Sequence, residues 1–567
     1  MSQLSELADK VRAQLTAPGA PFEVVETFVD GRPMQVYRNA FQNLPQFIAS
    51  AREHGDKPFI TFQDEVWTFS RFFAEADAIV AQLLNWGVKP GDRVAVAMRN
   101  RPEWAVVLVA TAMIGAVPAP INSFGLGEEL LAAITDVEPA VYACDLDRLK
   151  RINDETGVAG CRILCVGDGA ELPAGVADYQ TLISVAAAPQ PLPELAPEDP
   201  ALILFTSGAT SRAKGVLSSQ RAVCQALFNI DFIGAFSAMT SPEAIELLMK
   251  RGLPPTTLTA VPLFHVSGLH AQLLSALRGG RHLVFVTRWD PATAMELIRD
   301  QRITQFNGAP SMVMQLLAQP GFDDPAQSGS LGGIGFGGAG LPQRLITEVM
   351  QRRPNSMSGI GYGLTETNGT AAAASGTLFA YKPKSSGVIS PVVEVKVIDA
   401  SGEALPRCEA GEICLRGAPV MEGYWRDEAA TRAAMSDGWF RTGDVGYVDD
   451  EGFLFIVDRI KDVINRSGEK FAAAEVESCL LQIPDVLEAA VFAVPDEDTG
   501  EAAVAMLSVK EGSDLDEAKV KAHVAAHLAS YKVPAVVQLL VDSLPRNPAG
   551  KLLKVQLRNT YLGVTEG

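Results

Sequence analysis

Apolar residues come along the chain in short runs that predict strands and helices in alternation. Residues 91–100 contain a brief apolar run, residues 101–117 are apolar on every side, and residues 118–122 are apolar again. Short apolar strands around an apolar helix are typical of a parallel sheet that is covered on both faces. This pattern predicts a βαβ unit and an α/β fold class.

Similar units follow further along the chain. Residues 257–265 and 281–289 have strand patterns, residues 291–301 have a helix pattern, and residues 303–308 form another short strand. Before them, the proline-rich residues 189–200 predict a linker that enters a strand and separates two lobes.

The pattern of apolar and polar residues changes from Val392 onward. Residues 392–405, 412–417 and 446–459 are short alternating runs with turn residues, and the last of them turns at residues 449–452. Such runs predict β-hairpins. The residues after Arg459 have helix and strand patterns of their own and are numerous enough for a small second domain.

Composition limits the partners. The 567 residues include 48 Lys and Arg against 67 Asp and Glu, which gives a formal net charge of −19. So acidic a chain does not favour nucleic acid as a partner, or a polybasic membrane anchor. An anionic ligand must therefore be held in a local, shielded pocket.

The cysteines and the N-terminal residues indicate in which cellular compartment the protein is expected. The seven cysteines form no CxxC pair and no zinc-ribbon spacing, which indicates a reduced, cytoplasmic chain. Residues 1–15 resemble a polar helix and lack the apolar core of a signal peptide. The longest apolar stretch, residues 104–121, contains Pro118 and Pro120, so a buried helix and strand are favoured over a membrane span.

A small, hydroxylated loop follows the apolar run of residues 201–205. It spans residues 206–215 and ends in Lys214-Gly215. A polyphosphate-binding loop needs hydroxyl groups, accessible backbone N–H groups and a positive charge after a strand, and this segment has all three. An ordinary Ser/Gly turn is the alternative interpretation of the same sequence. Ala213 and Gly215 stand where a Walker A loop needs Gly and Ser/Thr, so the loop is not of that type.

Two glycine-rich motifs come later. Residues 335–340 satisfy GxGxxG, but a dinucleotide fold needs an acidic residue about 20 positions further on, where the chain reads SGIGYG and the first acid is Glu366. We therefore expect a glycine-lined floor for some other ligand. Residues 361–367 place Tyr362 between glycines and follow it with Glu366, so the ring could stack on a purine and the carboxylate hold Mg²⁺. A tight turn with a solvated glutamate is the alternative.

Histidines are sparse, with six in the chain. His265 ends a strand pattern, where α/β folds bind ligands, although a structural histidine fits as well. His523 and His527 are four residues apart without the glutamate of HExxH, which indicates a helix surface.

Further motifs complete a pattern that resembles the acyl-adenylate-forming superfamily. This superfamily includes acyl- and aryl-CoA synthetases, beetle luciferases and the adenylation domains of peptide synthetases. The resemblance covers about residues 50–555 and is closest to bacterial fatty-acid–CoA ligases. The additional motifs that carry it are residues 441–444 (RTGD), 458–462 (DRIKD), 467–469 (SGE) and 545–551 (PRNPAGK).

The resemblance implies a large domain over residues 1–457, with two sheet-and-helix lobes and a small β-barrel. A hinge at residues 458–462, centred on Lys461, would join it to a mobile α+β domain over residues 463–567. The implied reaction has two steps: a carboxylate attacks the α-phosphate of ATP to give acyl-AMP and pyrophosphate, and the thiol of coenzyme A then displaces AMP. ATP, Mg²⁺, CoA and a small carboxylic acid are the implied ligands, and a homodimer is left open.

The resemblance also assigns residues to the nucleotide. Tyr362 would stack on adenine, Asp444 would accept hydrogen bonds from the ribose hydroxyls, and Lys551 would bridge the carboxylate and the α-phosphate. Lys551, Glu366, Thr365 and His265 are the implied catalytic residues. The full nucleotide set is Thr206, Ser207, Gly208, Thr210, Lys214, Gly338, Ala339, Tyr362, Gly363, Thr365, Asp444, Ile456, Arg459 and Lys551.

Other roles follow from the same resemblance. Glu366 would be the metal ligand, and His265 a gate between the thiol and the carboxylate. Ser467, Gly468 and Glu469 would pass the pantetheine arm of CoA after a domain rotation that removes Lys551. The acyl pocket would be lined by His265, Asn307, Gly308, Gly335, Gly337 and Asn368.

The chain departs from the superfamily in two places. The phosphate loop has Ala209, Ser211 and Ala213 where Thr, Gly and Pro are usual, which predicts weaker pyrophosphate contacts. Asn465 replaces a lysine that plant coumarate-type ligases and luciferases carry near the hinge.

The acid pocket decides the substrate class. The expected pocket residues include no Lys or Arg to pair with a second carboxylate, and several are small. We therefore expect a medium- or long-chain fatty acid or another bulky hydrophobic acid, with an aryl acid as the alternative. His265 stands where peptide synthetases hold an amino group with Asp, which disfavours amino acids. A stand-alone ligase that loads a carrier protein, a luciferase-like oxygenase and a non-catalytic binding protein are the remaining alternatives.

Overall fold

The computed structural model describes residues 2–29, 31–152, 160–206, 213–337, 341–548 and 550–564. One lobe is built on a parallel sheet with strand order β6-β5-β7-β8-β9. The predicted βαβ unit is confirmed, because β5, α4 and β6 follow each other here and every residue of α4 is buried. The elements are β5 (Arg93–Ala97), α4 (Pro102–Met113), β6 (Val117–Pro120), α5 (Gly127–Val137), β7 (Val141–Asp145), β8 (Arg162–Val166) and β9 (Val176–Asp178).

The second sheet has 14 strands and holds the elements that position the site. Its parallel part runs β16-β15-β14-β12-β13-β3, and the strands beyond β16 are antiparallel. The strands expected as a small β-barrel form this antiparallel end and are hydrogen-bonded in continuity with the rest. The strands are β3 (Pro58–Phe62), β4 (Glu65–Thr68), β12 (Thr256–Thr259), β13 (His282–Phe285), β14 (Gln305–Gly308), β15 (Gly333–Phe336), β16 (Gly359–Leu364), β17 (Gly369–Ser375), β18 (Gly387–Ile389), β19 (Val393–Ile398), β20 (Gly411–Gly417), β22 (Met435–Ser436), β23 (Trp439–Val448) and β24 (Phe453–Arg459).

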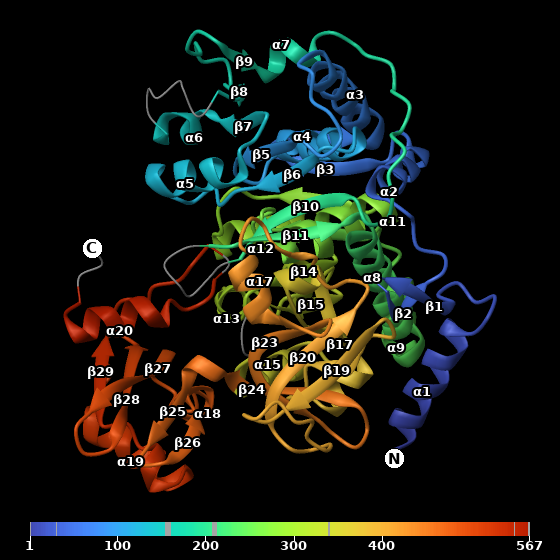
Figure 1. Cartoon of the computed structure of the whole chain (residues 1–567). Helices are drawn as coiled ribbons and strands as arrows, with labels where there is room; N and C mark the ends of the chain where they lie inside the picture. The colour runs from blue at the N-terminus through green and yellow to red at the C-terminus, as the bar shows by residue number, and fades with distance from the viewer. Residues whose placement is uncertain are drawn as a thin grey trace.

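A small antiparallel sheet lies between the two lobes (Figure 1). It consists of β10 (Pro200–Phe205), β11 (Gly215–Ser219) and β21 (Gly423–Tyr424). The proline-rich linker leads into β10 as predicted. Helix α8 (Gln220–Thr240) follows β11, and within the described residues it is the one helix long and apolar enough to cross a membrane. Because 61% of its apolar window is buried inside the protein, a core role accounts for this composition.

The C-terminal residues have a core of their own, built from apolar side chains between Ile464 and Leu557. Figure 1 shows this domain in red beside the large domain. Its sheet has the order β26-β25-β28-β27, with β29 beside β28. Its elements are β25 (Val463–Arg466), β26 (Glu469–Ala472), α18 (Ala473–Leu480), β27 (Val486–Asp496), β28 (Gly500–Val509), α19 (Glu517–His527), η5 (Ser530–Lys532), β29 (Val536–Leu540) and α20 (Lys554–Leu562).

The predicted α/β class, with a large domain and a small C-terminal one, is therefore confirmed. The hairpin predicted at residues 446–459 is also present, since β23 and β24 pair and turn at residues 449–452. The remaining elements are α1 (Gln3–Thr16), β1 (Val24–Val29), β2 (Arg32–Tyr37), α2 (Leu44–Ser50), η1 (Ala51–His54), α3 (Phe69–Asn85), α6 (Leu146–Arg151), α7 (Tyr179–Ile183), α9 (Pro242–Arg251), α10 (Val266–Gly268), η2 (Leu269–Leu274), α11 (Ser275–Gly279), α12 (Pro291–Asp300), α13 (Pro310–Leu317), α14 (Pro325–Ser328), α15 (Gln343–Arg352), η3 (Thr365–Thr367), α16 (Thr377–Tyr381), α17 (Glu428–Ala434) and η4 (Ile460–Asp462).

Candidate active site

Several of the predicted site residues lie at one edge of the 14-stranded sheet. Strands β14, β15 and β16 are parallel and in register, so their carboxyl ends meet at the same edge. Gly308 ends β14, Gly337 follows β15, and Thr365 follows β16. Ligands of open α/β sheets bind at the carboxyl ends of strands, so this edge is the expected place for one.

Asp444 is the centre of a buried polar cluster at the end of the antiparallel strands. The β23–β24 pairing places Asp444 opposite Arg459. The Tyr362 hydroxyl donates a 2.7 Å hydrogen bond to Asp444 Oδ2, and Arg459 Nε lies 3.2 Å from Oδ1. Burial and the Asp444 charge raise the pKa of Tyr362 well above its usual value. A carboxylate offers about four acceptor positions, so Asp444 retains capacity for ribose hydroxyls.

Glu366 is a buried carboxylate at the start of the turn after β16. Its Oε1 accepts a 2.9 Å hydrogen bond from the Tyr424 hydroxyl, and burial raises its pKa. Lys214 Nζ lies 4.9 Å from the centre of the Tyr424 ring. These groups fit a magnesium ion, because a cation would stabilise the ionised form of a carboxylate that burial disfavours.

The base of the predicted phosphate loop is closed by two hydrogen bonds. Thr206 N–H donates to the Lys214 carbonyl at 2.9 Å, and Lys214 N–H donates to Thr206 Oγ1 at 3.2 Å. This places both residues at the ends of β10 and β11. The other predicted phosphate and purine residues lie outside the described residues: Ser207, Gly208, Thr210, Gly338 and Ala339.

Lys551 comes to the same cluster from the C-terminal domain. Burial and the positive charges of Arg459 and Lys461 lower its pKa to about 8, while Asp444 and Asp462 act in the opposite direction. Its neighbour Gly550 lies so close to α13 that a Cβ atom there would be 2.6 Å from Ala309 Cβ. The motif that contains Lys551 is therefore docked on the large domain.

The predicted hinge and the predicted CoA segment come before Lys551 in the chain, at the start of the C-terminal domain. Lys461 is in the 3₁₀ turn η4, and just before it Asp458 Oδ2 accepts a 3.0 Å hydrogen bond from the N–H of Ala474 on α18. Ser467 and Gly468 form the exposed turn between β25 and β26, with φ angles of 55° and 89°. Glu469 starts β26 and is exposed as well. The structure therefore brings Lys551 to the cluster and leaves the SGE turn in solvent.

The glycines on the expected pocket wall differ in what they face. A Cβ atom at Gly335 would lie 2.1 Å from Asn307 Oδ1, and one at Gly308 would lie 2.8 Å from the Phe306 ring. Among these three, only Gly337 has no atom of the described residues within 4 Å of such a Cβ. At Gly335 and Gly308 the neighbours therefore already fill the space that a side chain would take.

Known proteins match both domains of the chain. The model of the AMP-binding enzyme family matches residues 47–425, and that of the AMP-binding enzyme C-terminal domain matches residues 475–551. The chain belongs to the AMP-binding enzyme family. The resemblance noted from the motifs is therefore confirmed, and the protein is an enzyme of the adenylate-forming type.

Named relatives of this AMP-binding enzyme include two ligases. Indoleacetate–CoA ligase of Aromatoleum aromaticum is 32% identical over 503 residues, which is 88% of this chain and 94% of the relative. 4-Coumarate–CoA ligase 2 of Nicotiana tabacum is 29% identical over 499 residues, 87% and 89% of the two chains. The crystal structure of ATP-bound MatB from Rhodopseudomonas palustris superimposes with a TM-score of 0.79 at 27% identity, covering 92% of this chain and 100% of MatB.

The buried polar atoms of the AMP-binding enzyme that have no hydrogen-bond partner among the described residues include His265 Nε2, Gln272 Oε1 and Asn368 Oδ1. Burial lowers the pKa of His265 to about 4, so its ring is neutral at physiological pH. The amide of Gln272 donates to the Asn307 carbonyl at 3.5 Å, and that of Asn368 donates to the Pro419 carbonyl at 2.9 Å. Because carbonyls only accept, the free atoms of both amides are acceptors.

Other predicted nucleotide residues have placements set by the fold. A Cβ atom at Gly363 would lie 1.6 Å from the Gly369 carbonyl oxygen, so the β16–β17 pairing itself requires glycine there. Ile456 is half-buried on β24 and pairs with Gly446. Thr365 begins η3 beside Glu366.

Sequence reasoning missed Tyr424 and Gln272. Tyr424 contacts Glu366 from a two-residue strand 58 positions later in the chain, and nothing in the local pattern around it signals that contact. Gln272 lies in the π-helical turn η2, which no periodicity predicts. Because π-helical turns are frequent at functional sites, the observed conformation of η2 marks Gln272 as a candidate site residue.

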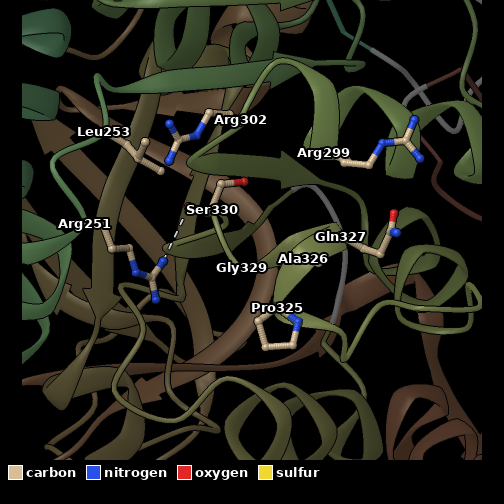
Figure 2. A pocket seen from close by; sticks show the side chains of 9 residues that line it. All are labelled: Arg251, Leu253, Arg299, Arg302, Pro325, Ala326, Gln327, Gly329 and Ser330. Atoms are coloured by element: carbon tan, nitrogen blue, oxygen red, sulfur yellow. Dashed lines mark hydrogen bonds between the residues drawn. The ribbon is translucent and has the colours of Figure 1, made fainter.

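Figure 2 shows a cavity of about 380 Å³ that contains none of the predicted site residues. Arg251, Arg299 and Arg302 line it, and Leu253, Arg302 and Ser330 each shortly precede a parallel strand. It therefore lies at the amino ends of the strands, opposite the edge that holds the site.

Proposed function

We propose that this AMP-binding enzyme joins a hydrophobic carboxylic acid to coenzyme A through an acyl-AMP intermediate. In the first step the acid displaces pyrophosphate from ATP. In the second step the CoA thiol displaces AMP and releases its proton. The placement of Lys551 beside Arg459 and Asp444 supports this proposal best, because it joins a cation from one domain to the nucleotide residues of the other.

The first step needs positive charge where the acid oxygen meets the α-phosphate. Lys551 would supply it and offset the charge that develops on the phosphate in the transition state. Asp444 would hold the ribose, with Tyr362 and Arg459 fixing its two oxygens. Mg²⁺, when bound through Glu366, would neutralise phosphate charge. Thr365 and Lys214 would contact the phosphates from β16 and β11.

The second step needs a different set of residues at the same edge. Rotation about Lys461 would withdraw Lys551 and bring in the turn of Ser467 and Gly468, which is exposed and free of neighbours within 4 Å at Gly468. His265 would separate the entering thiol from the acyl carbonyl. Since its ring is neutral, it would guide the thiol by shape and hydrogen bonding and not by charge.

An aromatic acid with a hydrogen-bond donor fits better than a fatty acid. The ligases named above act, by their names, on 4-coumarate and indoleacetate, and both of these acids carry an O–H or N–H on the aromatic group. The unpaired acceptors of Gln272 and Asn368 would receive such a donor. A fatty acid would leave them unpaired, which costs about 1–3 kcal/mol for each buried group. The fatty-acid expectation stays as the second candidate because Gly337 faces open space.

Pyrophosphate release tests the proposal directly. The purified enzyme is given ATP, Mg²⁺ and one acid at a time: 4-coumarate, cinnamate, indoleacetate, phenylacetate, octanoate and palmitate, each with and without CoA. We expect acid-dependent release that CoA accelerates, with 4-coumarate above cinnamate and indoleacetate above phenylacetate. Equal rates within these pairs would exclude the donor argument. A preference for octanoate or palmitate would establish the fatty-acid alternative, and release unaffected by CoA would indicate a different acceptor.

A further inference from the structure

Three metal-binding side chains meet on the C-terminal domain. Cys479 is near the end of α18, and His523 and His527 lie one turn apart on α19. One ligand atom of each residue lies within 4.8 Å of the others. The two imidazole rings are tilted neighbours with centroids 4.3 Å apart. The expectation of a plain helix surface is therefore wrong for His523, which is half-buried against α18.

We propose that Cys479, His523 and His527 form a binding site for a divalent transition metal of the zinc class. Thiolate and imidazole are the donors that Zn²⁺ prefers, and two histidines four residues apart on a helix present their rings on one face. Magnesium prefers oxygen ligands, so this site is chemically distinct from the one proposed at Glu366.

One ring nitrogen of each histidine is hydrogen-bonded to a backbone carbonyl. His523 Nε2 lies 3.1 Å from the Cys479 carbonyl, and His527 Nδ1 lies 2.8 Å from the His523 carbonyl. A carbonyl only accepts, so each of these nitrogens carries the proton of the neutral ring. The other nitrogen then holds a free lone pair, which is the arrangement that carbonyl partners impose on metal-bound histidines.

The surroundings of the three ligands also suit a cation. Glu475 is one turn before Cys479 on α18, so its carboxylate adds negative charge on the same helix close to the proposed ligands. Lys532 Nζ lies 2.7 Å from the Glu475 carboxylate and offsets part of that charge. His527 is exposed, so water can enter and complete the coordination.

Metal binding would require a small contraction and the loss of one proton. Zinc–sulfur and zinc–nitrogen bonds of about 2.3 and 2.0 Å place tetrahedral ligands roughly 3.5 Å apart. The exposed His527 ring at the end of α19 would rotate inward to close this gap and would give up its hydrogen bond to the His523 carbonyl. The metal–sulfur bond replaces the S–H bond of Cys479, and the proton passes to solvent. The metal would then tie α18 to α19, whereas the other end of α18 contacts Asp458 beside the hinge.

Cobalt binding to the untagged full-length protein tests the site without any ligase substrate. The protein is stripped with a chelator and titrated with Co²⁺, whose thiolate charge-transfer and tetrahedral visible bands report the ligands. We expect one equivalent to bind with both sets of bands, and Zn²⁺ to displace it. His527→Gln, a substitution at an exposed position, should weaken Co²⁺ binding about 10- to 100-fold, and Cys479→Ser should abolish the charge-transfer bands.

Cys408→Ser is the matched control, because Cys408 is an exposed free thiol on the large domain. This variant should bind Co²⁺ as the parent does. The proposal is overturned if the parent binds no Co²⁺ at one equivalent, if its spectrum lacks thiolate bands, or if His527→Gln binds with unchanged affinity. Circular dichroism of Cys479→Ser separates loss of the ligand from loss of the fold. None of these outcomes depends on the proposed ligase activity.

Discussion

The Tyr424 hydroxyl donates a 2.9 Å hydrogen bond to Glu366 Oε1. This contact joins the short strand β21 to the turn after β16, and Lys214 Nζ lies 4.9 Å from the centre of the same tyrosine ring. The end of the phosphate loop and the proposed metal ligand are thus linked through one side chain. A hydrogen bond from a hydroxyl stabilises the ionised form of a carboxylate, so Tyr424 opposes the effect of burial on the Glu366 pKa.

Tyr424→Phe should therefore shift the pH dependence of the first step. Loss of the hydrogen bond raises the pKa of Glu366 further, so a larger fraction is protonated at a given acidic pH and the acid limb of the profile moves to higher pH. The measurement is acid-dependent pyrophosphate release at limiting Mg²⁺ across pH 5–8. Extra Mg²⁺ or higher pH should restore most of the rate. An unchanged acid limb would show that Tyr424 does not act through Glu366.

Lys551 should define the alkaline limb of the same reaction. Its pKa of about 8 in the free enzyme means that the cation needed for the first step is lost as the pH rises above that value. We expect kcat/KM for ATP to fall with an apparent pKa near 8. Lys551→Arg should move this limb to higher pH, because a guanidinium stays charged. Lys551→Ala should lower the rate by about 100-fold or more, and a normal rate would refute the assignment.

The neighbourhood of Lys551 explains its low pKa and offers a second test. Lys461 contributes positive charge that disfavours protonation of Lys551. Lys461→Gln should therefore raise the pKa of Lys551 and move the alkaline limb to higher pH. The overall rate can fall as well, because the substitution also changes the predicted hinge, but this does not affect the position of the limb. A limb that stays in place would mean that another group titrates there.

The sequence supported the fold well because its signals were local. The apolar runs of residues 91–122 and the turn at residues 449–452 each predict an element from neighbouring letters, and β5, α4, β6 and the β23–β24 hairpin follow them. The family could also be inferred from the sequence, because each motif is a short run of neighbouring residues. These signals do not depend on which segments meet in space.

Contacts between distant segments were not predictable in this way. Gly335 and Gly337 are equivalent letters in one motif, yet only the β14–β15 pairing shows that Asn307 occupies the space beside Gly335. Tyr424 and Cys479 meet their partners through tertiary packing alone. The periodicity of α19 placed His523 and His527 on one face but could not show that α18 brings a thiol to it.

Asp444→Asn should weaken nucleotide binding more than Tyr362→Phe does. The first change removes the charge that pairs with Arg459 and that would accept hydrogen bonds from the ribose hydroxyls, and hydrogen bonds to a charged group contribute about 1.5–3 kcal/mol each. We expect the KM for ATP to rise about tenfold or more. Tyr362→Phe keeps the ring and removes one hydrogen bond to Asp444, so its effect should stay below about tenfold. Isothermal titration with a non-hydrolysable ATP analogue checks both, and the reverse order would contradict the proposed ribose contact.

Gly335→Ala and Gly337→Ala form a matched pair that separates packing from substrate choice. A methyl group at Gly335 would lie 2.1 Å from Asn307 Oδ1, which also accepts a 2.7 Å hydrogen bond from Gln305. Either Asn307 moves and that hydrogen bond breaks, or β14 and β15 separate, so we expect a loss of about 1–3 kcal/mol in unfolding free energy. At Gly337 no atom of the part of the chain that the structure describes lies within 4 Å, so the same methyl group should leave stability within about 1 kcal/mol of the parent. It should instead occupy pocket space and lower kcat/KM for the bulkier acids relative to the smaller ones.

Chemical denaturation and the acid panel measure the two effects. Equal loss of stability in both variants would show that Gly337 is a packing residue, and unchanged acid preference in Gly337→Ala would place the acid elsewhere on this edge.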